Sequence, residues 1–240
     1  MLDILGSSRT SDKRTLRQKA QGYEMRIRKM ITKAGAAGVT VFDWDDTLFP
    51  TVDIFSRQES TEECCEQLQE LAIVVEKLLK CCLRVGPVII VTNSEKGWVE
   101  YSAQTYFPSL TKVLQHCRVI SARTAYEEQY PEDRYTDASS IWKFLAFSLL
   151  LSEFKPSQLI SIGDSVKERQ ACLKVTAAST SRCLPKSVKL VSAPTSGTLI
   201  RELTLLRRLF EDLFTFNGPV DILFDGEDFQ LRTGHNSISL

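Results

Sequence analysis

The chain has 240 residues, of which 43% are hydrophobic and 25% are charged, and its formal net charge is zero. This composition is ordinary for a globular protein, and the length suits one large domain or two small ones. A zero net charge gives no clear signal for nucleic acid. No apolar run approaches the roughly 20 residues that a membrane-spanning helix needs, so a spanning protein is excluded.

Cysteine and histidine usage restricts the chemistry further. The chain has seven cysteines, two pairs of them adjacent, and no C-x-x-C pattern: Cys64, Cys65, Cys81, Cys82, Cys117, Cys172 and Cys183. We therefore expect no zinc site, and we interpret the cysteines as reduced thiols in a cytoplasmic protein without a signal peptide. The two histidines leave little room for a histidine-dependent triad.

Residues 1–36 are predicted to form a basic helical extension. Residues 9–33 carry nine lysines or arginines against two acids, and a helical pattern begins near Ser11 and ends before Gly35 and Gly38. One interpretation is a docking helix for an acidic protein partner or a membrane surface. The other is a solvated helix packed beside the core.

Residues 37–240 alternate between strand and helix patterns. Strands are expected at 39–44, 87–92, 117–121 and 158–163, with a weaker one at 187–191. Helices are expected at 61–83, 95–106, 138–151, 165–174 and 196–215. This alternation predicts an α/β fold with a doubly wound parallel sheet of about five strands. Residues 220–225 (VDILFD) could add an edge strand, and the last eight residues are expected to be disordered.

Polar groups follow the predicted strands, at the edge where sheets of this class bind ligands. The first strand ends in Asp43, Asp45, Asp46 and Thr47, the second in Thr92, Asn93 and Ser94, the third in Ser121 and Arg123, and the fourth in Gly163, Asp164 and Ser165, with Glu168 beyond. Clustered carboxylates beside a buried strand are costly without a cation or donors. The pattern favours a site for a hard cation over a plain solvated turn.

These motifs resemble those of the haloacid dehalogenase-like (HAD) hydrolase superfamily over residues 39–175. Four segments carry the resemblance: D-x-D-x-T at Asp43, Asp45 and Thr47; Thr92 after the second strand; Lys143; and Gly163–Asp164 with Glu168, where aspartate is commoner. The resemblance implies a Rossmann-like fold and phosphoryl-transfer chemistry.

The resemblance also implies a role for each position. Asp43 would be the nucleophile that forms an aspartyl-phosphate, and Asp45 the general acid and base. Mg²⁺ would be held by Asp43, the backbone carbonyl of Asp45, and Asp164. Thr92, Asn93 and Lys143 would bind the phosphoryl group, with Thr47 and Glu168 in support.

Several positions keep a simpler explanation. Lys143 competes with Lys96 and Lys167 for the phosphate, and it fits a solvated helix lysine as well. Asp164 could cap a helix, Thr92 could bond its own backbone, and Asn93 and Ser94 could cap the next helix. The three tryptophans, Trp44, Trp98 and Trp142, are expected to pack rather than to contact substrate, and Arg123 is expected at the surface.

The spacing between motifs leaves little room for a cap domain. About a dozen residues separate Thr47 from the helix near Thr61, which fits a short hairpin. The chain thus resembles the capless branch, whose open sites tend to accept macromolecular substrates or to be closed by a partner. We also hypothesise that the loop at 125–140 lies over the site and selects substrates.

The sequence therefore predicts a Mg²⁺-dependent phosphatase acting on a phosphomonoester. The missing cap disfavours a phosphomutase, and the second acid disfavours a dehalogenase. A non-catalytic binding or scaffold protein on the same fold is the alternative. The joint presence of Asp43 and Asp45 favours catalysis, because a scaffold needs neither. The sequence leaves the identity of the phosphorylated substrate open.

Overall fold

The computed structural model describes residues 38–57, 62–134, 136–224, 229–233 and 236–239. The basic extension predicted at 1–36 lies outside these residues. Within the described part, no helix is both long and apolar enough to cross a membrane.

An eight-stranded sheet forms the centre of the molecule, in the order β3-β2-β1-β4-β5-β6-β7-β8. Its first six members in that order are all parallel, and β7 and β8 add an antiparallel ribbon at one edge. The strands are β1 (Val39–Phe42), β2 (Val88–Thr92), β3 (Arg118–Ser121), β4 (Gln158–Gly163), β5 (Leu184–Lys189), β6 (Val220–Phe224), β7 (Phe229–Thr233) and β8 (Asn236–Ser239). This is an open Rossmann-like α/β sheet.

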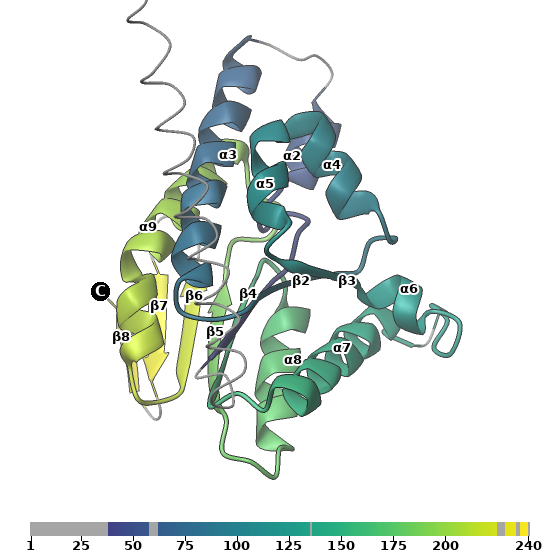
Figure 1. Ribbon diagram of the computed structural model, residues 1–240, viewed down its shortest axis with the longest axis vertical. Coiled ribbons are helices and arrows are strands. Elements are labelled where there is room, and N and C mark those ends of the chain that lie inside the picture. The colour runs from purple at the N-terminus through teal and green to yellow at the C-terminus, as the bar shows by residue number, and fades with distance from the viewer. Residues whose placement is uncertain (1–37, 58–61, 135, 225–228, 234–235, 240) are drawn as a thin grey trace, which may run out of the picture.

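Helices cover both faces of the sheet (Figure 1). The apolar cluster on one face includes residues of α3 (Glu62–Leu83), α4 (Trp98–Tyr106), α5 (Thr111–Leu114) and α9 (Ser196–Thr215). The cluster on the other face includes residues of α6 (Ala122–Tyr126), α7 (Ala138–Phe154) and α8 (Val166–Ala177). The central strands β1, β2 and β4 are buried along their whole length. Their near-continuous apolar sequence follows from burial on both faces.

The predicted α/β class and parallel sheet are confirmed, but the strand count of about five is too low. Strand β5 begins at Leu184, three residues before the predicted weak strand. The edge strand expected at 220–225 is β6, and the sheet continues beyond it. The disorder expected for the last eight residues is wrong for 236–239, which pair with β7 as β8. The two strands of this ribbon are only five and four residues long, so they leave a weak strand pattern in the sequence.

The segment after the first strand also differs from expectation. The hairpin predicted between Thr47 and Thr61 is wrong for its described residues, because Thr51–Ser56 form the short helix α2. Asp53 on α2 accepts hydrogen bonds from the backbone N–H of Ser196 (2.8 Å) and from its hydroxyl (2.6 Å), and it pairs with Arg57. Thus α2 is tied to the first turn of α9. None of its residues is buried.

Candidate active site

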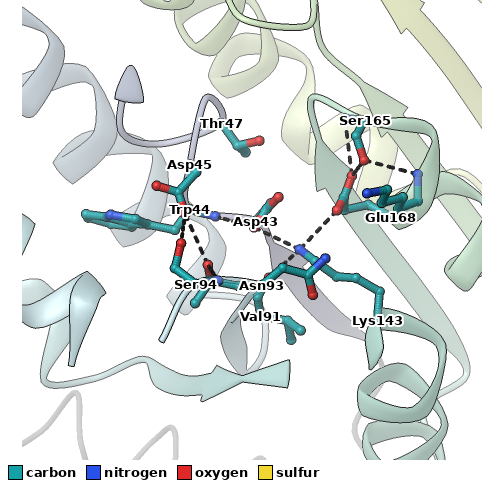
Figure 2. Close-up of polar contacts among 12 residues, drawn as sticks. Asp43, Trp44, Asp45, Thr47, Val91, Asn93, Ser94, Lys143, Ser165 and Glu168 are labelled. Carbon is teal, nitrogen blue, oxygen red and sulfur yellow. Dashed lines mark hydrogen bonds and ion pairs between the residues drawn. The ribbon is translucent and has the colours of Figure 1, made fainter. Parts of the chain in front are cut away.

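The carboxyl ends of three neighbouring strands bring the predicted motifs together. Strand β1 pairs with β2 on one side and with β4 on the other. Asp43 follows β1, Thr92 ends β2, and Asp164 follows β4. Because parallel strands end at one edge of a sheet, residues more than 100 positions apart meet there (Figure 2).

Lys143 lies at the centre of this group. It projects from α7 and is fully buried, with its Nζ 2.8 Å from Oδ1 of Asp43 and 3.0 Å from Oε1 of Glu168. The same ammonium donates to the carbonyl of Val91 at 2.6 Å. Burial alone would lower the pKa of Lys143, but the carboxylates of Asp43 and Glu168 outweigh it and raise that pKa. The ammonium is therefore held charged beside the two acids.

The competing lysines do not occupy this position. Lys167 donates to the hydroxyl of Ser139 at 2.5 Å, and its ammonium lies 3.9 Å from Asp137. Lys96 is exposed. Lys143 is thus the lysine that the fold brings to the acids.

Glu168 combines two tasks. Its carboxylate accepts hydrogen bonds from the N–H and the hydroxyl of Ser165, which caps α8, and its other oxygen faces Lys143. Burial favours a raised pKa for Glu168, but Lys143 and Ser165 reverse this and lower it. A Cβ on Gly163 would lie 2.5 Å from this side chain, so only glycine fits at that position. The helix cap proposed for Asp164 is wrong, because Ser165 is the N-cap residue.

Three carboxylates converge on one point. Ligand oxygens of Asp43, Asp164 and Glu168 all lie within 4.8 Å of one another. Burial raises the pKa of Asp43 well above its usual range, with Lys143 only partly offsetting the effect. Burial and the charge of Glu168 raise the pKa of Asp164 to about 6. When all three acids are ionised, their charge exceeds that of Lys143 by two, and an all-oxygen donor set of this kind suits a hard divalent cation.

The side chain of Asp45 points elsewhere and is surrounded by donors. Its Oδ1 accepts from the hydroxyl of Thr51 (2.6 Å) and from the indole N–H of Trp98 (2.8 Å). Its Oδ2 accepts from the hydroxyls of Ser94 (2.7 Å) and Thr92 (3.2 Å). We call this set the Asp45 cradle. The cradle holds the Asp45 carboxylate next to the acid cluster, but the carboxylate is not a member of that cluster.

Two members of the Asp45 cradle were assigned other roles from the sequence. Trp98 was expected only to pack, and no local pattern distinguishes an indole that donates to an acid 53 residues away. Ser94 was considered as a cap for the next helix, but the N-cap of α4 is Gly97, which has a left-handed φ of 94°. The position of Ser94 just after the end of β2 was the signal in the sequence that could have indicated a role in the site.

Thr92, which ends β2, and Asn93, which follows it, are the two predicted phosphate-binding residues there, and both bond to other groups of the protein. The hydroxyl of Thr92 accepts from the N–H of Ser94 at 2.9 Å besides donating to Asp45. The side-chain amide of Asn93 donates to the carbonyl of Ser139 at 3.1 Å. Its carbonyl oxygen, Oδ1, is buried and has no hydrogen-bond partner in the part of the chain that the structure describes.

The turn after β1 links the motifs to one another. Asp46 has a left-handed φ of 54°, and its carboxylate accepts from the N–H of Val52. This reversal places Thr47 so that its hydroxyl accepts from the N–H of Asp164 at 3.0 Å. The supporting role of Thr47 thus has a concrete form: it connects the turn after β1 to the turn after β4.

The remaining expectations concern residues away from the acids. Trp44 is buried and donates to Ser102, and Trp142 is buried and donates to the carbonyl of Tyr130, so both pack as predicted. Arg123 pairs with Glu127 at the surface, as expected. The Trp142 contact ties the loop at 125–140 to α7, and the role of that loop in substrate selection stays a prediction.

A cavity of about 570 Å³ lies beside α2, lined by residues that include Ile54, Phe55, Leu68 and Tyr106. It contains none of the predicted site residues, and the chemistry is better located by the convergent acids than by this hollow. A scan against protein-family models, a search of curated proteins and a search of solved structures each returned no match. The candidate site therefore depends on its own residues and geometry.

Proposed function

We propose that the protein is a Mg²⁺-dependent phosphatase of the capless HAD type, which hydrolyses a phosphomonoester through an aspartyl-phosphate on Asp43. The observation that carries the proposal is the meeting of Asp43, Asp164 and Glu168 around one buried lysine. A purely structural cluster of this charge would be destabilising. Phosphoryl transfer through an aspartyl-phosphate gives such a cluster a use, because it needs a carboxylate nucleophile, ligands for a cation and positive charge near the phosphoryl oxygens.

In the first step, a carboxylate oxygen of Asp43 attacks phosphorus and the bond to the leaving oxygen breaks. The leaving oxygen takes a proton from Asp45. In the second step, water attacks the phosphorus of the aspartyl-phosphate and gives a proton to Asp45, which frees phosphate and restores Asp43. Bound Mg²⁺ would be held by Asp43, the carbonyl of Asp45, and Asp164, and it supplies positive charge that offsets repulsion between the nucleophile and the phosphate.

The other residues orient the two aspartates and neutralise charge on the phosphoryl group. Lys143 keeps Asp43 aligned and contributes a positive charge to the phosphoryl oxygens. Asn93 would bind the phosphoryl oxygens through its side-chain amide nitrogen, which carries two N–H donors and uses one on the carbonyl of Ser139. The Asp45 cradle holds the proton carrier in one place. The described residues between Asp43 and α3 contain only the short helix α2, which supports an open site that admits a macromolecular substrate.

Hydrolysis of a generic aryl phosphate, measured with and without Mg²⁺, tests the proposal. We expect activity in the wild type that requires Mg²⁺ and is lost in Asp43→Asn. Asp212→Asn is the matched control, because it makes the same carboxylate-to-amide change at an exposed residue of α9, outside the acid cluster. A folded wild type without activity, or equal activity in Asp43→Asn, would refute the proposal and favour the non-catalytic binding protein.

A further inference from the structure

Three aromatic side chains form a continuous surface at the edge of the site. We call Phe55 on α2, with Trp98 and Tyr101 on α4, the aromatic rim. The ring centroids of Phe55 and Trp98 are 6.2 Å apart, and those of Trp98 and Tyr101 are 6.1 Å apart. Phe55 is 58% exposed and Tyr101 is 62% exposed. The rim thus presents ring surface to solvent from two separate helices.

The exposure of the rim is built into the fold. The helix α2 carries Val52, Ile54 and Phe55, yet none of its residues is buried. The hydrogen bonds from Ser196 to Asp53 tie α2 to α9, and Ile54 packs partly buried against the core, so Phe55 keeps a fixed position although its ring is largely exposed. Exposing a fixed cluster of large apolar groups is unfavourable unless the cluster binds something.

The rim is joined directly to the proposed chemistry. The indole N–H of Trp98 lies 2.8 Å from Oδ1 of Asp45. Under the proposed function, Asp45 protonates the leaving oxygen, so the leaving group has to lie next to Asp45. A group beside Asp45 is also beside the indole of Trp98, whose ring neighbours those of Phe55 and Tyr101. The rim is in the position that determines which leaving groups are accepted.

We propose that the aromatic rim binds an aromatic ring of the leaving group, so that the substrates are phosphomonoesters whose alcohol or phenol carries such a ring. This inference rests on the proposed phosphatase function. Rings stack favourably against exposed aromatic faces. A sugar leaving group would instead need free polar partners, and the two charged groups on α2, Asp53 and Arg57, already bond each other.

Benzyl phosphate and n-propyl phosphate form the decisive substrate pair. Both leave as simple alcohols, so they differ in the ring rather than in intrinsic reactivity. We expect the wild type to prefer benzyl phosphate about tenfold in kcat/KM, mainly through KM, as one aromatic contact allows. Tyr101→Ser and Phe55→Ser should each reduce that preference severalfold. Leu149→Ser, which changes an exposed residue on α7 away from the site, should leave it unaltered.

The outcomes separate this inference from the proposed function. Equal kcat/KM for the two esters, or a preference that both rim variants retain, would overturn the inference while Asp43→Asn still abolishes hydrolysis. That result would leave the rim as a contact surface for a protein partner. No hydrolysis of either ester by the wild type would overturn both. If the wild type does prefer benzyl phosphate, a second comparison identifies the source of the ring. Faster turnover of a phosphotyrosyl peptide than of free phosphotyrosine would indicate a protein substrate, and equal turnover would indicate a small phenolic ester.

Discussion

At the scale of single residues, the site is organised by shared hydrogen-bond partners. Lys143 serves Asp43 and Glu168 at once, and Glu168 also caps α8 through Ser165. Asp45 is separate from this group and has its own four donors. Asp43 and Asp45, the proposed nucleophile and proton carrier, are thus held by different networks, so that each can be altered without removing the other.

The first residue-scale prediction concerns the indole donor to Asp45. Trp98→Phe keeps an aromatic ring but removes the N–H, and we expect kcat for n-propyl phosphate to fall about tenfold, since a hydrogen bond to a charged group contributes about 1.5 kcal/mol. Trp142→Phe is the matched control, because its indole donates to Tyr130 and not to the site. Steady-state kinetics of both variants check this, and equal kcat in Trp98→Phe and wild type would contradict it.

The second residue-scale prediction concerns the buried lysine. Lys143→Met leaves the carboxylates of Asp43 and Glu168 without their cation, so we expect the free energy of unfolding to fall by about 3 kcal/mol, with hydrolysis lost. Lys167→Met, whose ammonium is partly exposed and bonds Ser139, should cost less than about 1 kcal/mol. Urea unfolding of the metal-free proteins measures both. A loss in Lys143→Met no larger than in the control would refute the central role of this lysine.

At the scale of elements, two hydrogen bonds join α2 to the start of α9. Asp53 of α2 accepts from the first residue of α9, Ser196, where backbone N–H groups lack partners inside the helix. Burial by itself would raise the pKa of Asp53, but the bonds from Arg57 and Ser196 outweigh it and lower that pKa. This contact positions α2, and with it Phe55 of the aromatic rim.

Asp53→Asn should therefore destabilise the protein by about 1–2 kcal/mol at neutral pH, because the charged acceptor at the α9 N-terminus is lost. Since the pKa of Asp53 is lowered by folding, its stabilisation is present above the ordinary value of 3.8 and is lost as pH falls through the folded value. Denaturant unfolding at neutral and acidic pH tests this. Glu76→Gln, in an exposed pair with Lys80, should change stability by less than about 0.5 kcal/mol. A difference in unfolding free energy between wild type and Asp53→Asn that stays constant at all pH values would contradict a stabilising role for the ionised Asp53.

At the scale of the whole molecule, the sheet order turns separate motifs into one acidic site whose charge opposes folding. Burial and Glu168 raise the pKa of Asp164 from 3.8 to about 6. Between those values the folded chain holds a proton that the unfolded chain releases. In the metal-free protein, the contribution of Asp164 to stability therefore falls as pH rises from about 4 to about 6.

Comparison with Asp164→Asn isolates this contribution. Without metal, we expect the two proteins to be similarly stable near pH 4, and the variant to be more stable by up to about 3 kcal/mol above pH 7. Saturating Mg²⁺ should stabilise the wild type above pH 6 and the variant much less, because the cation requires the ionised carboxylate. Urea unfolding with EDTA or Mg²⁺ provides the measurement. No pH dependence in the difference, or equal stabilisation of both by Mg²⁺, would contradict the metal assignment to Asp164.

Much of the fold was predictable because its signals are local. The apolar runs of β1, β2 and β4 and the helical spacing of α3 and α9 are complete within a few residues, and these elements lie where the sequence predicted them. The β7–β8 ribbon and α2 were not predicted. The strands of the ribbon are only five and four residues long, so their local pattern is weak. The helix α2 depends on the tie from Asp53 to a residue 143 positions away, and a contact so distant leaves no periodic pattern in the chain.

The sequence by itself determined the fold class and the group of candidate residues after the strands, because strand hydrophobicity and the polar residues that follow it are adjacent in the chain. Only the tertiary structure decided which side chains meet. It selected Lys143 over Lys96 and Lys167, placed Glu168 with Asp43 and Asp164, and brought Trp98 to Asp45. The physical reason is that electrostatic and hydrogen-bond partners are fixed by distance in space, and the order of the strands in the sheet sets that distance.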